Sequence, residues 1–508
     1  MKGRVIMVQG TASNAGKSVL VTALCRIFKN DGFTVAPFKA QNMSLNSFVT
    51  PDGGEIGRAQ AVQAEAAGIA PSVEMNPILL KPEAHSRSQV VVRGRPRMTT
   101  TAAGYYQLKS QLWPIVTESL DKLRSQYEVI VIEGAGSPAE VNLSRDEIVN
   151  MRLARYCQAP VLLVGDIDRG GVFASLLGTL WLLDPADLRL VKGLVINKFR
   201  GDLSLLEPGL RFLEEKANLP VLGVIPYFQD IAIAQEDSVA LEQLPPQSPT
   251  YQLDIAVIRL PHIANFDDFD PLTRERGVRL RYVNAVKNLG KPDLIILPGS
   301  KTTLADLDWM RASGLAERIT GLYQQGAFIV GICGGYQMLG TSIHDPHHVE
   351  SAATSSRGLA LLPVTTTFLA TKQTHQVKGS VAGSRGLLAA ARDIDFEGYE
   401  IHMGSTESDA EGTAFRLRER SGQPCDRRDG YLDDSGRVLG TYIHGLFHNK
   451  EVRRAILRHI AEAKGQHLNF TDDGRRENEY DRLADLVSRN LNMSLVYAIT
   501  GLSISPQK

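Results

Sequence analysis

A glycine-bounded segment near the start of the chain constrains the fold more than any other. It comprises Gly10-Thr11-Ala12-Ser13-Asn14-Ala15-Gly16-Lys17-Ser18, and it lies between the apolar run Val5–Val8 and an apolar helical run over residues 19–28. Glycines followed by Lys-Ser between a strand and a helix are typical of a phosphate-binding loop. Such a loop requires an α/β fold in which a buried strand leads into a helix N-terminus.

The residue types in this segment indicate how it would hold a nucleotide. Gly10 and Gly16 allow the backbone to curl so that its N–H groups point at phosphate oxygens. Lys17 would contact the terminal phosphates of ATP, and the Ser18 hydroxyl would bind Mg²⁺. The predicted ATP-binding residues are Gly10, Thr11, Asn14, Gly16, Lys17 and Ser18, together with Asn197, which follows a later strand.

Apolar runs recur through the first half of the chain and alternate with helical segments such as 58–67 and 102–123. Runs that are apolar throughout are typical of strands buried on both faces. We therefore predict a doubly wound, mostly parallel sheet with ligands at the carboxyl ends of its strands. The runs are Val5–Val8, Val35–Phe38, Val129–Ile132, Val161–Val164, Leu194–Ile196 and Val221–Ile225.

Polar residues follow three of these runs. Glu133 is placed to bind Mg²⁺ or to orient water, although a carboxylate there could also cap the following loop. Asn197 could recognise the adenine edge through its donor and acceptor. Asp166 could approach the metal or the substrate, but aspartate is also common in strand-to-helix turns.

The length of the chain and a proline-rich segment near its middle indicate more than one domain. With 508 residues, it is long enough for several domains with sizeable cores. We predict a first domain over residues 1–234, a linker over 235–252 that contains three prolines, and a second domain over 253–470. The second domain restarts with parallel-type strands and continues with more alternating ones, and a helix and tail follow over 471–508.

Charge and cysteine usage exclude several classes of partner. The chain has 56 Lys plus Arg and 56 Asp plus Glu, so no bulk field attracts nucleic acid or an anionic membrane. Four scattered cysteines without a paired spacing favour a reducing cytoplasm. No apolar stretch is long and unbroken enough to span a bilayer. We therefore expect a cytoplasmic protein whose ligands are small molecules.

A second motif lies in the other half of the chain. The apolar run 327–330 leads into Gly331-Ile332-Cys333-Gly334-Gly335-Tyr336-Gln337, which puts a cysteine at a strand-to-helix turn. Small neighbours let substrate approach such a turn, and a helix N-terminus favours the nucleophilic thiolate. The alternative is a buried structural cysteine, which is a common role for free thiols.

This second motif resembles the nucleophile motif of class I glutamine amidotransferases, which release ammonia from glutamine. The resemblance implies that Cys333 is the nucleophile, that His444 is its base, and that Gly299 and Ser300 supply oxyanion donors. Many members carry a glutamate two residues after the histidine, but Leu446 stands at that position. Either another group orients His444, or the protein uses a Cys-His dyad.

The first half resembles the dethiobiotin-synthetase-like branch of phosphate-loop proteins, which phosphorylate carboxylates with ATP. The two halves together resemble the cobyric acid synthase family of corrinoid biosynthesis, notably over 38–46, 55–60, 398–404 and 442–447. This implies that Lys39, Asp146 and Asp166 lie in the synthetase site. Its sister family, cobyrinic acid a,c-diamide synthase, shares the architecture but lacks the segment 39–43.

The resemblance implies ATP- and glutamine-dependent amidation of the b, d, e and g carboxylates of adenosylcobyrinic acid a,c-diamide, with Mg²⁺ as a cofactor. Two other functions remain open at this stage. One is a nucleotide-driven switch without catalysis, which would have no use for Cys333 and His444. The other is an amidotransferase that acts on a different carboxylate, such as a peptidoglycan precursor.

Overall fold

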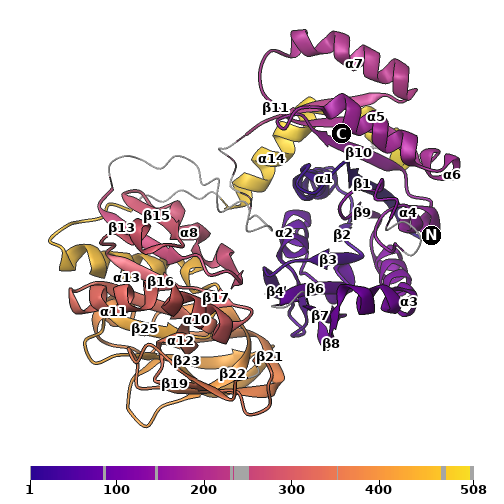
Figure 1. Ribbon diagram of the computed structural model, residues 1–508. Coiled ribbons are helices and arrows are strands. Elements are labelled where there is room, and N and C mark those ends of the chain that lie inside the picture. Colours follow the sequence, from indigo (N-terminus) through magenta and orange to yellow (C-terminus); the bar gives the residue numbers. More distant parts are fainter. Residues whose placement is uncertain are drawn as a thin grey trace.

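The chain folds into two α/β domains that lie side by side (Figure 1). The computed structural model describes residues 2–83, 87–142, 147–228, 231, 233, 251–351, 353–470 and 476–503. The predicted linker 235–252 falls almost wholly outside the described residues. Among the residues described, every helix is too short or too polar to span a lipid bilayer.

A six-stranded parallel sheet forms the centre of the first domain, in the order β12-β11-β10-β1-β9-β2. Each strand contains one of the six apolar runs, so the predicted doubly wound sheet is confirmed. The strands are β1 (Arg4–Gly10), β2 (Val35–Phe38), β9 (Val129–Glu133), β10 (Val161–Asp166), β11 (Val191–Phe199) and β12 (Val221–Pro226).

Side chains of the sheet alternate between two cores. In β1, Met7 packs into one core, while Ile6 and Val8 pack into the other. The first core is covered by helices α3 (Ala102–Gln126), α4 (Met151–Cys157), α5 (Val172–Leu182) and α7 (Leu203–Ala217), and α6 (Pro185–Leu188) connects α5 to β11. Helix α1 (Lys17–Asn30) covers the second core.

The C-terminal segment returns to the first domain. Helices α14 (Arg476–Asn490) and α15 (Met493–Thr500) pack on the same core as α1, and α14 lies beside α1 in Figure 1. Arg26 of α1 donates two hydrogen bonds to Asp481, at 2.7 and 2.8 Å. The segment placed after the second domain in the sequence therefore completes the core of the first domain in space.

An insertion between β2 and α3 faces the second domain. It forms a small sheet in the order β3-β6-β7-β8, a hairpin of β4 and β5, and the buried helix α2. Its elements are β3 (Gln41–Met43), β4 (Ser47–Val49), β5 (Glu55–Gly57), α2 (Arg58–Ala67), η1 (Val73–Met75), β6 (Ile78–Glu83), β7 (Arg87–Val92) and β8 (Arg95–Thr101). Three of these strands have only three residues, which is too short for a periodic sequence signal.

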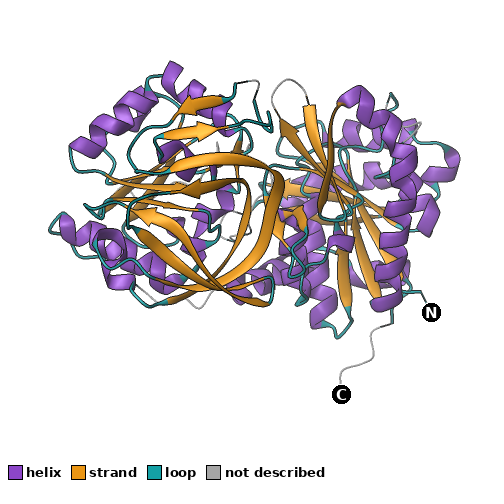
Figure 2. Cartoon of the chain, turned by 90° about the horizontal axis from the view of Figure 1, so that it is seen from below, coloured by secondary structure: helices purple, strands orange, loops and turns teal. Residues whose placement is uncertain are grey.

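The second domain contains one large mixed sheet, in the order β15-β13-β16-β18-β25-β24-β23-β21-β19-β20, with β22 paired to β21. The first five strands are parallel, and most later pairings are antiparallel, as the change in pattern predicts. Both sheets and their flanking helices are visible in Figure 2.

The strands of this domain are β13 (Leu253–Ile258), β14 (Ile263–Ala264), β15 (Val278–Val283), β16 (Leu294–Leu297), β17 (Gly299–Ser300), β18 (Phe328–Ile332), β19 (Ser342–His344), β20 (Ser355–Arg357), β21 (Thr365–Val381), β22 (Asp395–Glu407), β23 (Thr413–Arg420), β24 (Gln423–Leu432) and β25 (Val438–Thr441). Its helices are η4 (Phe266–Phe269), α8 (Asp270–Thr273), α9 (Val286–Leu289), α10 (Thr303–Ala312), α11 (Leu315–Gln324), α12 (Gly334–Leu339), η5 (Gly386–Ala391), η6 (Leu446–His448) and α13 (Lys450–Ala463).

A buried charge cluster joins the two domains. Glu55 of β5 contacts Lys81 at 2.6 Å in its own domain and Lys372 of β21 at 2.5 Å across the interface. Burial opposes ionisation of Glu55, but the two ammonium groups outweigh it and hold its pKa well below the ordinary value. The docked domains therefore share one buried carboxylate that is neutralised from both sides.

We expect Glu55→Gln to lower the free energy of unfolding by about 3 kcal/mol at pH 7, because it leaves two buried lysines without their counter-charge. Since the folded pKa of Glu55 lies below that of an unfolded glutamate, its stabilisation is present above the unfolded pKa and is lost as the pH falls. Urea unfolding of wild type and variant should therefore converge in acid.

Asp426→Asn is the matched control, because Asp426 pairs with Arg416 at 2.7 Å while both side chains are exposed. This variant should leave the free energy of unfolding close to that of the wild type, because solvent screens an exposed pair. Equal losses for the two variants would contradict the interfacial role of Glu55.

Candidate active sites

The phosphate-binding loop joins β1 to α1 and is closed by its own lysine. Gly16 caps the helix with φ 102°, and a Cβ there would lie 1.9 Å from the Asn197 Nδ2 atom. Five residues separate Gly10 from Gly16, one more than in the common pattern. Lys17 Nζ donates to the carbonyl oxygens of Ala12 (2.9 Å) and Gly136 (3.1 Å), so it curls over the loop where phosphates would lie.

Glu133 lies at the end of β9, beside this loop, and is fully buried. Its Oε1 atom accepts hydrogen bonds from Ser18 Oγ and Lys39 Nζ, both at 2.8 Å, and its Oε2 atom accepts one from Gln63 Nε2 at 2.5 Å. Burial raises the pKa of Glu133, but Lys39 and the hydrogen bonds outweigh burial and lower it. Glu133 is therefore an ionised carboxylate next to the phosphate-binding loop.

The Ser18 hydroxyl and the Glu133 carboxylate fit a magnesium ion. Mg²⁺ prefers oxygen ligands and often takes only one or two from the protein, completing its shell with phosphates and water. Among the described residues, no group of three or more His, Cys, Asp or Glu side chains could hold a metal without such help.

Other predicted residues meet at the same edge of the sheet. Asn197 Nδ2 donates to the Ala15 carbonyl at 2.9 Å, so its amide lies against the loop. Asp166 accepts from Lys198 Nζ at 2.8 Å, and the same Nζ donates to the Asn14 carbonyl at 2.7 Å. The backbone N–H of Thr11 donates to Val164 at 2.9 Å. Asp146 lies outside the described residues.

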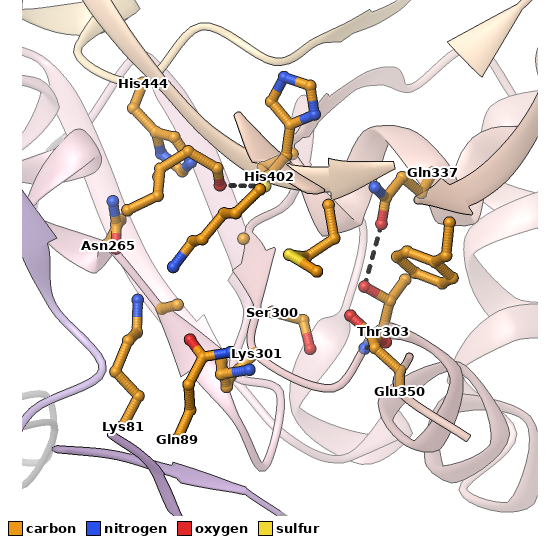
Figure 3. A pocket seen from close by; sticks show the side chains of 17 residues that line it. Lys81, Gln89, Asn265, Ser300, Lys301, Thr303, Gln337, Glu350, His402 and His444 are labelled. Carbon is orange, nitrogen blue, oxygen red and sulfur yellow. Dashed lines mark hydrogen bonds between the residues drawn. The ribbon is translucent and has the colours of Figure 1, made fainter. Parts of the chain in front are cut away.

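The second motif forms a sharp turn between β18 and α12. Cys333 has φ 53° and ψ −110°. Residues other than glycine rarely adopt this backbone conformation, but it occurs at the strained turns that carry nucleophiles. A Cβ on Gly335 would lie 1.9 Å from the Leu297 carbonyl oxygen, so only glycine fits there. The thiol lines a cavity together with His444 (Figure 3). Cys333 is buried at the edge of the apolar core, where it borders this cavity.

Asp268 orients His444. Its Oδ2 atom lies 2.7 Å from His444 Nδ1, and its Oδ1 atom accepts from the Gly445 N–H at 2.7 Å. Leu446 is buried in the apolar core and makes no such contact. The position left open by Leu446 is thus filled by a carboxylate 176 residues before His444, and a single sequence holds no local signal for that pairing.

Asp268 also sets the charge of the imidazole. Burial lowers the pKa of His444, but the Asp268 charge and hydrogen bond, with help from Cys333, raise it to about 10. His444 Nε2 has no well-aligned hydrogen-bond partner among the described residues. Tyr399 stacks on the ring with centroids 5.2 Å apart. An imidazolium held by Asp268 beside a cysteine is the arrangement in which a thiol can act as a nucleophile.

Gly299 and Ser300 form β17, next to the cysteine. A Cβ on Gly299 would lie 3.3 Å from His444 Cε1, and a Cβ on Gly334 would lie 2.9 Å from the Ser300 backbone nitrogen. Both residues also line the cavity. The structure therefore brings the predicted oxyanion residues, the nucleophile and the base to one place.

The cavity is lined by both domains (Figure 3). Lys81 and Gln89 come from the first domain, and the remaining lining residues come from the second. Glu350 is partly buried there, and desolvation raises its pKa to about 8, although Lys301 and the Thr303 N–H favour the ionised form. Ammonium groups and hydrogen-bonding side chains in a small cavity suit a small polar ligand that carries a carboxylate.

Comparisons with known proteins agree with this geometry. Residues 6–240 match the CobQ/CobB/MinD/ParA nucleotide binding domain, and residues 254–452 match the CobB/CobQ-like glutamine amidotransferase domain. The chain is 53% identical over 496 residues to a cobyric acid synthase of Dehalococcoides mccartyi strain CBDB1, covering 98% of each protein. Identity is 51% over 506 residues to that of Moorella thermoacetica, again covering 98% of each. Similarity of this extent shows that the chain belongs to the cobyric acid synthase family.

Proposed function

We propose that this enzyme amidates the b, d, e and g carboxylates of adenosylcobyrinic acid a,c-diamide, using ATP and ammonia from glutamine. One observation carries the proposal: the cavity that holds Cys333 and His444 is walled in part by Lys81 and Gln89 of the nucleotide-binding domain. Ammonia released there already faces the domain that would consume it. All four cysteines are free, which suits a reducing cytoplasm.

In the first site, a substrate carboxylate oxygen attacks the γ-phosphorus of ATP, and ADP leaves. The acyl phosphate so formed is attacked by ammonia, and phosphate departs with the original carboxylate oxygen. Lys17 lies where it would neutralise the transferred phosphoryl group. Mg²⁺, held by Ser18 and Glu133, would supply further charge neutralisation when bound. Lys39 keeps Glu133 ionised for that role.

In the second site, the Cys333 thiolate attacks the side-chain amide carbon of glutamine. Backbone N–H groups near Gly299 and Ser300 would stabilise the oxyanion. His444 donates its proton to the departing ammonia, and Asp268 holds the imidazole in the orientation this transfer needs. His444 then accepts a proton from the water that hydrolyses the thioester.

The direct test is mass spectrometry of the corrinoid after incubation with ATP, Mg²⁺ and glutamine. We expect four successive conversions of carboxylate to amide, each with one ATP and one glutamine consumed. An ATP hydrolysis rate that is the same with and without the corrinoid would favour the nucleotide-driven switch. Amidation of a peptidoglycan precursor in its place would favour the other amidotransferase.

Cys333→Ala should separate the two chemistries. It should abolish glutamine-dependent product but retain amidation with high ammonium above neutral pH, because an acyl phosphate accepts ammonia from any source. Lys17→Ala disables the other site and should therefore lose product with glutamine and with ammonium alike. Near-normal use of glutamine by Cys333→Ala would contradict the glutaminase assignment.

Asp268→Asn should lower the kcat of glutamate release by about 10²- to 10⁴-fold. Burial alone lowers the pKa of His444, so loss of the Asp268 charge should bring that pKa down. The alkaline limit of glutaminase activity should therefore move to lower pH.

The measurement is glutamate release across a range of pH, with ammonium-dependent amidation followed in parallel and expected to be unchanged. Leu446→Met is the control and should stay within about twofold of wild type, because it conserves volume and adds no carboxylate to orient the imidazole. An unchanged pH profile in Asp268→Asn would show that Asp268 does not set the charge of His444.

A further inference from the structure

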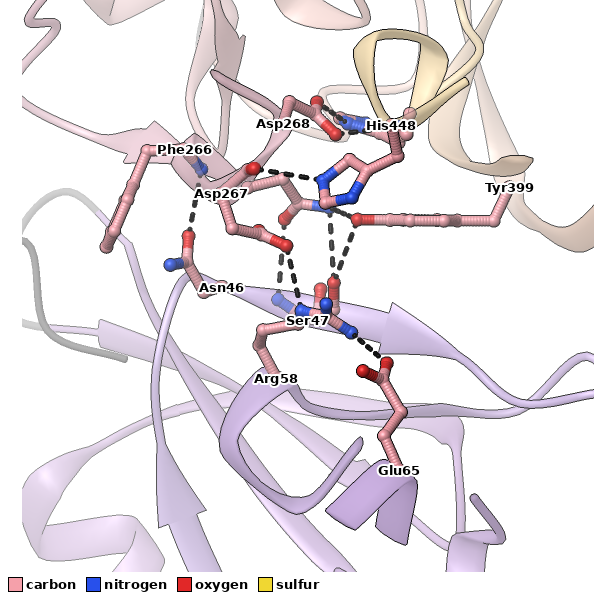
Figure 4. Close-up of polar contacts among 12 residues, drawn as sticks. Asn46, Ser47, Arg58, Glu65, Phe266, Asp267, Asp268, Tyr399 and His448 are labelled. Atoms are coloured by element: carbon pink, nitrogen blue, oxygen red, sulfur yellow. Dashed lines mark hydrogen bonds and ion pairs between the residues drawn. The ribbon is translucent and has the colours of Figure 1, made fainter. Parts of the chain in front are cut away.

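Asp267, which precedes the Asp268 carboxylate that contacts His444, is paired with Arg58 from the other domain (Figure 4). Arg58, the first residue of α2, places its Nε atom 2.8 Å from Asp267 Oδ2. Both side chains are buried, and Asp267 directly precedes Asp268. The contact is an ion pair between charges rather than a well-aligned hydrogen bond.

Arg58 itself is fixed on its remaining sides. Its Nη1 atom lies 3.1 Å from Glu65 Oε1, and its guanidinium lies over the Phe48 ring, 5.2 Å from the centroid. Burial lowers the pKa of Arg58, but Glu65 and Asp267 outweigh burial and raise it above its ordinary value. Asp267 therefore faces a permanent positive charge at a fixed place.

The helix that carries Arg58 belongs to the synthetase site. Helix α2 is buried along nearly its whole length, and Gln63, in the same helix, bonds to Glu133. A helix buried on all sides cannot shift without disturbing the core around it. The nucleotide-binding domain therefore fixes the position of Arg58.

The loop that carries Asp268 depends on the first domain at other points too. The Phe266 N–H donates to Asn46 Oδ1 at 3.1 Å, and Tyr399, which stacks on His444, donates to the Ser47 carbonyl at 3.3 Å. Within its own domain, the Asp267 carbonyl lies 3.1 Å from His448 Nε2. The triad carboxylate is thus placed by a loop that spans the interface.

We propose that Arg58 is a positioning residue of the glutaminase: through Asp267 it fixes the loop that places Asp268 against His444. This inference rests on the proposed glutaminase function. The orientation of His444 in the second domain would then depend on Arg58 in the first domain. Glutamine would then be hydrolysed efficiently only while the synthetase domain is docked.

The charges around this loop show why an arginine is needed. Burial and Asp268 favour the protonated form of Asp267 and raise its pKa, although Arg58 and His444 oppose this. Asp270, Tyr282 and Tyr399 also interact electrostatically with Asp267 and Asp268, and Tyr480 interacts with Arg58. Without Arg58, two adjacent buried carboxylates would repel one another, and the loop would move to separate or protonate them.

The test compares Arg58→Met, which keeps the bulk and removes the charge, with wild type in the full-length enzyme. The kcat of glutamate release should fall about ten- to a hundredfold, because a small displacement of a catalytic group has effects of this size. The KM for glutamine and the ammonium-dependent amidation should stay within about twofold. Arg58→Lys, which keeps the charge, should fall between wild type and Arg58→Met.

Asp267→Asn supplies the second half of a double-mutant cycle and carries the test if Arg58→Met does not fold. It should cause a comparable loss of kcat, and the double variant should be no worse than either single one, because both changes remove the same ion pair. Thr374→Val is the control for the loss of one interface contact that does not involve Asp267, since it removes a 2.7 Å hydrogen bond to the Gly53 carbonyl in the other domain. Its kcat should be unchanged.

Normal glutamate release by Arg58→Met or by Asp267→Asn would overturn this inference alone, as would an equal loss of ammonium-dependent amidation. Additive losses in the double variant would also overturn it. Absence of glutamate release from wild type would overturn the proposed function, and this inference with it.

Discussion

The hydrogen bond between Asp268 and His444 determines what the second domain can do. Both side chains are buried, so neither can exchange its partner for water, and the carboxylate keeps the imidazole protonated against the effect of burial. The nucleophile, the oxyanion donors and the cavity are arranged around the free side of that ring. Without this bond, Cys333 would be a strained cysteine beside a neutral histidine.

In the phosphate-loop site the charges are reversed: a cation keeps a buried carboxylate ionised. There, a buried carboxylate, Glu133, is kept ionised by Lys39, and Ser18 and Gln63 donate hydrogen bonds to its oxygens. In each site one buried charge is held by a partner from a distant part of the chain. Ionised groups fixed before substrate arrives need little reorganisation during reaction, which is how preorganised sites lower barriers.

The sequence predicts a strand or a site residue correctly where a short local pattern marks it. Apolar runs predicted the six parallel strands, and the glycine motifs placed Lys17 and Cys333 at strand-to-helix turns. Asp268 and Gln63 could not be predicted, because each acts on a residue far away in the chain and has an unremarkable neighbourhood. Arg58 lies in a stretch noted for its family likeness, but its contact with Asp267 exists only in the folded interface.

The placement of the C-terminal helices was hidden for a similar reason. The sequence predicts a helix within residues 471–508, and α14 lies in that range. Nothing in a pattern of period 3.6 specifies which domain covers its apolar face. Tyr480 and Leu483 are buried in the same core as α1, so the chain closes its first domain with its last residues.

We expect ammonia released beside Cys333 to reach the first site inside the docked domains, because the first domain lines the same cavity. The most direct measurement uses glutamine labelled with ¹⁵N in its side-chain amide, together with excess unlabelled ammonium in solution, and determines the isotope in the corrinoid amide. The account predicts that nearly all product nitrogen carries the label near neutral pH. Label diluted to the composition of the bulk ammonium pool would contradict it.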